Sequence, residues 1–258
     1  MSTPVLHPDL VITPPSAAEA TAMDRDGFVI LRGLVDSHWL AALAARFDEL
    51  VASEGERAGL EVHREDGTDR LANLVDKGEV FDALWMHPRL LGLVQFVLRR
   101  AFVLSSLNAR EPKPGLGHQA LHADWNDLTP EEPFQVVNSL WVLDGMDAGN
   151  GATRLVPGSH HLRGQISDPH PDQVLALSDP GDVIVFNAHC RHGGTTNVDG
   201  RRRRVIHSYF IAAEHGQQCD FAKWVSAATC ARLTPAQRSM LRVKLQTVGD
   251  SSPPPLTH

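Results

Sequence analysis

Residues 181–197, GDVIVFNAHCRHGGTTN, contain the pattern that decides the fold class. Asp182–Phe186 is a short apolar run typical of a buried strand, and His192 comes just after it. From about residue 101 onward, similar runs are separated by Gly, Pro, Asn and Asp, which are turn-forming residues. We therefore expect a β core with a hairpin turn at Asn150-Gly151. Its strands are predicted at Phe102–Asn108, Gln119–Asp124, Val136–Leu143, Ala152–Val156, Asp182–Phe186 and Val205–Ala212.

The segments on either side of this core have helical patterns. Ser16 and Glu19 have capping-box spacing, and the short strand Phe28–Leu31 follows that helix. Asp36 can cap a second helix, Pro88 precedes a third, and Thr234-Pro235 begins one near the end. We expect one domain over residues 1–258, made of an extended lead-in outside the core (1–15), helical support (16–100), the β core (101–215) and a helical segment with a frayed tail (216–258).

Composition excludes several classes of protein. The 258 residues are 42% hydrophobic and 21% charged, which is typical of a folded globular chain rather than a disordered or fibrous one. Lys+Arg 24 against Asp+Glu 31 gives a net charge of −7, so a nucleic-acid partner is not expected. No run of about 18 apolar residues predicts a membrane span. The three cysteines fit neither a disulfide framework nor a zinc ribbon, so we expect a reducing, cytoplasmic location.

His122-Ala123-Asp124 is the sharpest local motif. On a strand, residues i and i+2 project from one face, so this imidazole and carboxylate would point together at a metal. His192, 70 residues later (192 − 122 = 70), can supply a third ligand. Two histidines and one carboxylate leave coordination positions of iron open for a co-substrate and dioxygen. His189 is the alternative third ligand, but the residue 11 positions after it is Gly200.

Arg203 lies 11 residues beyond His192 (203 − 192 = 11), at the entrance to the strand Val205–Ala212. A co-substrate with two carboxylates would need a cation for its far end, and a guanidinium can bind a carboxylate through two hydrogen bonds. For the other three arginines of the run 201–204, an ordinary solvated position is expected. His160 and His161 are expected to make structural hydrogen bonds, and Cys190 has no base to make it a nucleophile.

With these motifs in order, the chain resembles the phytanoyl-CoA dioxygenase family of Fe(II)/2-oxoglutarate oxygenases. The resemblance runs from about residue 20 to 213. It is carried by DRDGFVILRGLV (24–35), RLANLVDKGEVFDALW (70–85), QALHADW (119–125), NGATRLVPGSHH (150–161), GDVIVFNAHCRHGGTTN (181–197) and the arginine-rich entrance to VIHSYF (205–210).

The resemblance implies a mainly β fold, a double-stranded β-helix (jelly-roll or cupin-like) core with flanking N-terminal and C-terminal helices. It implies His122, Asp124 and His192 as iron ligands and Arg203 as the partner of the far carboxylate of 2-oxoglutarate. The same resemblance suggests Gln119, Thr153 and Asn73 as further co-substrate contacts. The implied reaction consumes O2 and 2-oxoglutarate, releases succinate and CO2, and oxidises a C–H bond of a small molecule, such as an intermediate of specialised metabolism.

Several alternatives remain open. Hydroxylation is the expected outcome, but ring closure, desaturation or epimerisation use the same chemistry; halogenation is disfavoured because Asp124 is present. A zinc hydrolase could use the same three ligands, although it would not need Arg203 or Gln119. A metal-free binding module would be expected to have lost a ligand. We expect Trp125, Asn126 and a lid over Asp127–Pro133 to form the substrate pocket, because they directly follow the metal motif.

Overall fold

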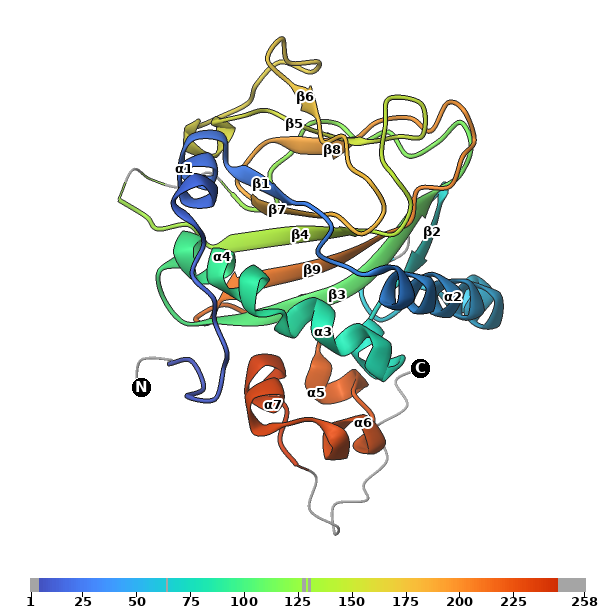
Figure 1. The fold of residues 1–258 in the computed structure, drawn as a ribbon, viewed down its shortest axis with the longest axis vertical. Coiled ribbons are helices and arrows are strands. Elements are labelled where there is room, and N and C mark those ends of the chain that lie inside the picture. The colour runs from blue at the N-terminus through green and yellow to red at the C-terminus, as the bar shows by residue number, and fades with distance from the viewer. Residues whose placement is uncertain (1–4, 64, 127–128, 130, 246–258) are drawn as a thin grey trace, which may run out of the picture.

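The computed structural model describes residues 5–63, 65–126, 129 and 131–245, which form two antiparallel β-sheets that face each other (Figure 1). Over these residues the larger sheet has six strands in the order β1-β7-β4-β9-β3-β2, and the smaller has three in the order β6-β5-β8. This arrangement confirms the predicted double-stranded β-helix core. The strands are β1 Phe28–Leu31, β2 Thr68–Leu71, β3 Phe102–Pro112, β4 Val136–Val142, β5 Thr153–Leu155, β6 Val174–Leu175, β7 Val183–Asn187, β8 His192–Gly194 and β9 Val205–Ala212.

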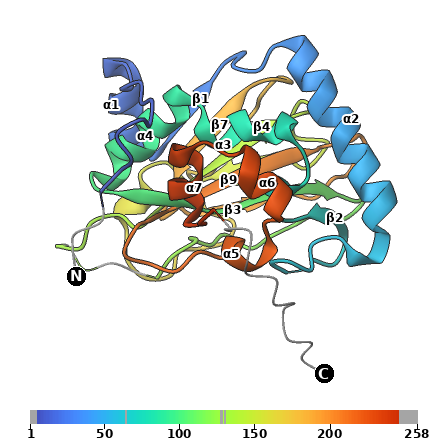
Figure 2. The same ribbon diagram turned by 90° about the horizontal axis from the view of Figure 1, so that it is seen from below.

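Helices cover the face of the larger sheet that points away from the smaller sheet (Figures 1 and 2). Seen from below, α3, α6 and α7 lie in front of β9 and β3 (Figure 2). The α-helices are α1 Ala17–Asp26, α2 Ser37–Glu54, α3 Asp82–Met86, α4 Pro88–Leu98, α5 Phe221–Trp224, α6 Ala227–Arg232 and α7 Pro235–Leu241, with single 3-10 turns at Gly55–Arg57, Leu74–Asp76, Glu79–Phe81 and Ser159–His161. Within the described residues, none of the helices has the length and apolar character needed to cross a bilayer.

Local capping explains where several helices begin. The Ser16 side chain accepts the Glu19 N–H, and the Glu19 carboxylate in return accepts the Ser16 N–H, as the capping-box spacing predicts. The Asp36 carboxylate accepts the first free N–H groups of α2 at 2.9 Å. Thr234 and Gln237 form a second capping box at α7, with Pro235 in its first turn. These three helices therefore begin where the sequence predicts.

Two hydrophobic cores lie on opposite faces of the larger sheet. The core beneath the helices contains the largest aromatic side chains, including Trp85, Trp141 and Phe47, each at most 1% exposed. A smaller core between the two sheets contains Leu155 and Ile184. Because burying an aromatic side chain removes the largest apolar area from water, the helix side supplies most of the hydrophobic stabilisation.

The N-terminal part of the chain contributes more than helical support. β1 pairs with β7, and β2 pairs with β3, so residues 16–100 provide both edge strands of the larger sheet. The sequence predicts β1 from its apolar run. It does not predict β2, because Thr68–Leu71 reads TDRL and has no apolar alternation.

The predicted hairpin at Asn150-Gly151 is wrong, because β4 and β5 belong to different sheets. Asn150 instead holds the connection that crosses between the sheets. Its side-chain Nδ2 donates to the Gly145 carbonyl at 2.6 Å, and its Oδ1 accepts the Asp147 N–H at 2.9 Å. Asn150-Gly151 therefore does lie in a turn, as its composition indicates, but the strands before and after this turn, β4 and β5, do not pair with each other.

The described part of the lead-in, residues 5–15, packs on the helix-side core, which corrects its predicted exclusion from the core. Leu6, Leu10 and Ile12 are partly buried there. The Thr13 N–H donates to the Pro88 carbonyl at 3.0 Å, at the start of α4. Residues 249–258 of the predicted tail lie outside the described residues.

Gly92 of α4 lets the lead-in approach closely, and we predict that Gly92→Ala destabilises the protein. A Cβ at this position would lie 1.8 Å from the Thr13 carbonyl oxygen, a backbone atom. Alanine favours a helix interior by about 1 kcal/mol, but overpacking a tight contact costs about 1–3 kcal/mol, so we expect a net loss. Urea unfolding should show the free energy of unfolding lowered by about 1 kcal/mol or more.

The matched control is Gly216→Ala, where an added Cβ meets nothing within 4 Å. Unchanged or increased stability of Gly92→Ala relative to this control would show that the lead-in does not pack on α4 in solution.

Candidate metal centre

A single backbone bridge joins His122 to His192. Each residue donates its N–H to the carbonyl of the other at 2.9 Å, and residues paired in this way project their side chains to one face. The two imidazole rings accordingly have centroids 4.4 Å apart. His192 begins β8, whereas His122 lies outside every strand, so the predicted strand Gln119–Asp124 is reduced to this bridge.

Both imidazoles are held in the state that binds metals. Nδ1 of His122 lies 2.8 Å from the Ala120 carbonyl, and Nδ1 of His192 lies 2.9 Å from the Cys190 carbonyl. A carbonyl can only accept, so each Nδ1 carries a proton, and in the neutral ring this leaves the lone pair on Nε2. Burial lowers the pKa of His192, which keeps its ring neutral.

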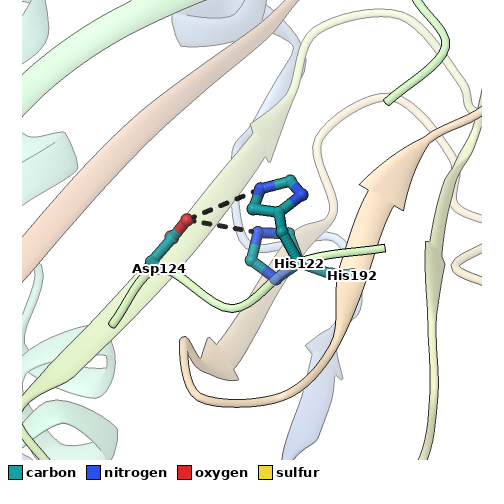
Figure 3. A group of neighbouring side chains, drawn as sticks. All are labelled: His122, Asp124 and His192. Atoms are coloured by element: carbon teal, nitrogen blue, oxygen red, sulfur yellow. Dashed lines mark ion pairs between the residues drawn. The ribbon is translucent and has the colours of Figure 1, made fainter. Parts of the chain in front are cut away.

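Asp124 completes the cluster (Figure 3). Its Oδ1 lies 3.7 Å from Nε2 of His122 and 3.6 Å from Nε2 of His192, so all three side chains point at one place. One potential ligand atom from each residue lies within 4.8 Å of the others. The Asp124 backbone is also held by hydrogen bonds. Its N–H donates to the Ala188 carbonyl, and its own carbonyl accepts the Tyr209 hydroxyl. The arrangement can hold one divalent cation between two nitrogens and an oxygen.

The cluster lines a cavity of about 360 Å³ between the two sheets. Its walls include residues of β2, β3, β4, β7 and β9 of the larger sheet and of β5 and β8 of the smaller sheet. This volume is within the range of small-molecule pockets, about 300–1,000 Å³. Of the residues predicted to contact a co-substrate, Arg203, Gln119 and Thr153 all line this cavity.

Arg203 is a buried cation without an anionic partner in the described part of the chain. It is 1% exposed, and its Nε and Nη2 atoms have no hydrogen-bond partner there. Burial, together with the nearby Arg110, lowers the pKa of Arg203 to about 9, so the guanidinium remains charged at neutral pH. Burying an unpaired charge is unfavourable, which indicates that this site is built to receive an anion.

The neighbouring arginines are already paired. Arg201 bridges Asp147 and Asp199, Arg202 bridges Asp48 and Glu111, and Arg204 bridges Asp48 and Asp144. Arg204 is nearly buried, which differs from the solvated position expected of it. Within the run 201–204, Arg203 therefore differs from the others in having free donors in the cavity.

Of two further residues predicted to contact the co-substrate, Gln119 lines the cavity and Asn73 does not. The Gln119 Oε1 accepts the Gly194 N–H at 3.1 Å, which leaves its Nε2 directed toward Glu65 at 3.4 Å on the cavity wall. Asn73 does not line the cavity; its amide donates to the Trp224 carbonyl at 3.1 Å. The predicted role of Asn73 as a co-substrate contact is therefore wrong for this cavity.

Trp125 and Asn126, which are predicted to form the substrate pocket, are not among the residues that line the cavity. The Trp125 ring packs on His215, with centroids 4.8 Å apart, and Asn126 is exposed. Asp127, Leu128 and Pro130 of the predicted lid lie outside the described residues.

The remaining histidines of the sequence motifs serve the fold. The His189 Nε2 accepts the Gln135 N–H at 3.0 Å, away from the metal cluster. His160 and His161 both contact the Asp24 carbonyl. Burial lowers the pKa of His160 and of His189 to about 4, so both are neutral. Burial likewise raises the pKa of Cys190 to about 11, which leaves this thiol protonated.

Glu65, Arg110 and His207 line the cavity but are not predicted from the sequence to belong to the site. Glu65, in the loop before β2, makes a bidentate ion pair with Arg110 of β3 at 2.6 and 2.8 Å and also contacts Arg70. Burial and these arginines hold the pKa of His207 well below its usual range. Alternation along β3 and β9 could have indicated that Arg110 and His207 face inward, but nothing local identifies Glu65.

Comparisons with known proteins agree with this geometry. The sequence profile of the phytanoyl-CoA dioxygenase (PhyH) family matches residues 23–205. "Dioxygenase trt7" of Aspergillus terreus is 29% identical over 214 residues, which cover 78% of this chain and 73% of that protein. "Multifunctional dioxygenase ausE" of Emericella nidulans is 26% identical over 264 aligned positions, covering 91% of this chain and 86% of that protein.

Solved structures share the fold. HygX from Streptomyces hygroscopicus, solved with nickel and 2-oxoglutarate bound, superposes with a TM-score of 0.67 at 15% identity, covering 80% of this chain and 90% of that one. The family profile spans more than half of the chain, and the relatives in sequence are dioxygenases. The chain belongs to the phytanoyl-CoA dioxygenase (PhyH) family.

Proposed function

We propose that this protein is an Fe(II)/2-oxoglutarate-dependent dioxygenase that hydroxylates a C–H bond of a small molecule. In this proposal His122, Asp124 and His192 hold the iron, and Arg203 holds the far carboxylate of 2-oxoglutarate. One observation carries the proposal. A three-ligand cluster and a buried, unpartnered guanidinium face the same cavity of about 360 Å³.

The donor set fits iron(II). Two neutral imidazole nitrogens and one carboxylate oxygen form the ligand set of non-haem iron oxygenases, which leaves positions open for other ligands. Each Nε2 is kept available because the other ring nitrogen is bonded to a backbone carbonyl. When bound, iron and 2-oxoglutarate would supply the oxidising power by activating O2 as 2-oxoglutarate is converted to succinate and CO2.

The co-substrate end of the cavity fits a dicarboxylate. Arg203 offers two free donors to a carboxylate, and Thr153, 6% exposed, lines the same cavity. The unpaired guanidinium also argues against a zinc hydrolase, which would bind water and its substrate at the same ligands and leave Arg203 without a partner. The chain's own contribution is to orient the co-substrate and to exclude bulk water from the reacting centre.

A cavity of about 360 Å³ favours a small-molecule substrate, and we propose an intermediate of specialised metabolism. The wall beyond the metal cluster carries Ser106, Asn108 and Tyr209, together with the apolar Leu140 and Phe186. Trp125 and Asn126 directly follow the ligand Asp124 in the sequence, and we propose that they extend the substrate pocket beyond the cavity lining. We place the protein in the cytoplasm, because its three cysteines are all buried and unpaired.

Asp124→Ala is expected to abolish both metal binding and turnover, because it removes the anionic ligand of the cluster. Binding of Mn(II), a redox-inert substitute, can be measured by calorimetry. Succinate formed from 2-oxoglutarate can be measured with iron in excess. His189→Ala is the matched control, since it removes a buried histidine that the proposal places outside the site. Mn(II) binding that survives in Asp124→Ala would show that Asp124 is not a ligand, and loss of binding in His189→Ala would make His189 a ligand in place of His192.

Arg203→Ala is expected to weaken 2-oxoglutarate binding while leaving the Mn(II) affinity unchanged. Truncating one partner of a buried charge pair costs about 2–5 kcal/mol, which corresponds to about 30-fold or more in Kd. Calorimetric titration of 2-oxoglutarate into the Mn(II)-loaded protein measures this change. Arg201→Ala, a neighbour with its charge satisfied at the surface, should retain the parent Kd. A parent-like Kd in Arg203→Ala would place the dicarboxylate elsewhere and refute this part of the proposal.

A further inference from the structure

We propose that Asn138 is a positioning residue that restricts Asp124 to a single metal-facing oxygen. This inference rests on the proposed function, because it concerns how the cluster would hold its metal. Asn138 lies in the middle of β4 and is 7% exposed. Its side-chain Nδ2 donates to Oδ2 of Asp124 at 3.2 Å. The other carboxylate oxygen, Oδ1, is the one that approaches both histidine Nε2 atoms.

The direction of this hydrogen bond is fixed by a second contact. The backbone N–H of Ser139 donates to the Asn138 Oδ1 at 2.9 Å. A backbone N–H is only a donor, so the oxygen of the Asn138 amide must face Ser139 and its NH2 group must face Asp124. An ionised carboxylate is acceptor-only, which matches this orientation. The β4 backbone therefore sets which atom Asn138 presents to the metal ligand.

Asp124 needs such support because it does not belong to a strand. Its backbone is held by Ala188 and Tyr209, but those contacts leave the side chain free to rotate. A carboxylate that turned both oxygens toward the metal would occupy one more coordination position. Fewer positions would then remain for a chelating co-substrate and O2. By occupying Oδ2, Asn138 keeps the carboxylate a one-oxygen ligand.

Asn138→Leu tests this role, because leucine keeps the volume but removes the donor. Loss of a residue that orients a ligand typically weakens metal binding by about 10–100-fold, and we expect the Mn(II) Kd to rise by that factor. A change in ligand arrangement should also alter the visible absorption spectrum of the Co(II)-substituted protein. Asn108→Leu is the matched control: it removes another buried amide from the same cavity wall, one without contact to Asp124. Its Mn(II) Kd and Co(II) spectrum should match the parent.

The variant Asn138→Asp distinguishes a role in orienting Asp124 from a purely structural role in β4. This variant keeps an oxygen to accept the Ser139 N–H, so β4 is retained, but it replaces the donor to Asp124 by an oxygen. We expect parent-like circular dichroism and a changed Co(II) spectrum. It also serves in place of Asn138→Leu should the leucine variant fail to fold.

Co(II) spectra of the folded Asn138 variants that superimpose on the parent spectrum would overturn the inference. A raised 2-oxoglutarate Kd with an unchanged Mn(II) Kd and a parent-like Co(II) spectrum would also overturn it, by making Asn138 a co-substrate contact. If Asp124→Ala itself leaves Mn(II) binding unchanged, the metal site of the proposed function fails instead, so the two failures are distinguishable.

Discussion

The backbone bridge between His122 and His192 is the contact on which the rest of the site depends. It joins a loop to β8 and sets both imidazoles on one face. The two segments approach so closely that side chains do not fit. A Cβ on Gly193 would lie 2.8 Å from the Gln119 carbonyl, and one on Gly194 would lie 2.7 Å from the Gly117 carbonyl. The glycine pair after His192 is thus required by the metal centre, because without it the bridge could not form.

Electrostatics imposes the second constraint. Arg70, Arg110 and Arg203 all line one cavity, and Glu65 is shared between the first two. The cavity lining also contains the Asp124 carboxylate, so two carboxylates face three guanidinium groups and leave an excess of positive charge. A bound dicarboxylate would offset this charge, whereas water would solvate it poorly in so enclosed a space. The charge of the cavity walls therefore favours an anionic ligand.

The sequence predicts correctly the features that depend on neighbouring residues or on several motifs in a fixed order along the chain. The caps at Ser16, Asp36 and Thr234 need only neighbouring residues, and the structure has the helices there. It failed where a partner is remote. The Asn150-Gly151 turn has the composition of a hairpin, but its flanking strands join different sheets. The sequence does not identify Asn138 either, because its proposed role depends on a hydrogen bond to Asp124, which lies in a different segment of the chain.

A β-bulge explains how one sheet can support both a dry core and a polar cavity. In β3 the register with β9 shifts between Leu104 and Ser106. Leu104 and Leu107, an odd number of residues apart, can therefore both face the helix-side core, while Ser106 and Asn108 face the cavity. Because the large aromatic residues on the helix side supply the stability, the inner face is free to carry unpaired polar atoms. Leaving these polar atoms unpaired costs stability, and the cost is tolerated where they line the cavity, because bound ligands would supply their hydrogen-bond partners.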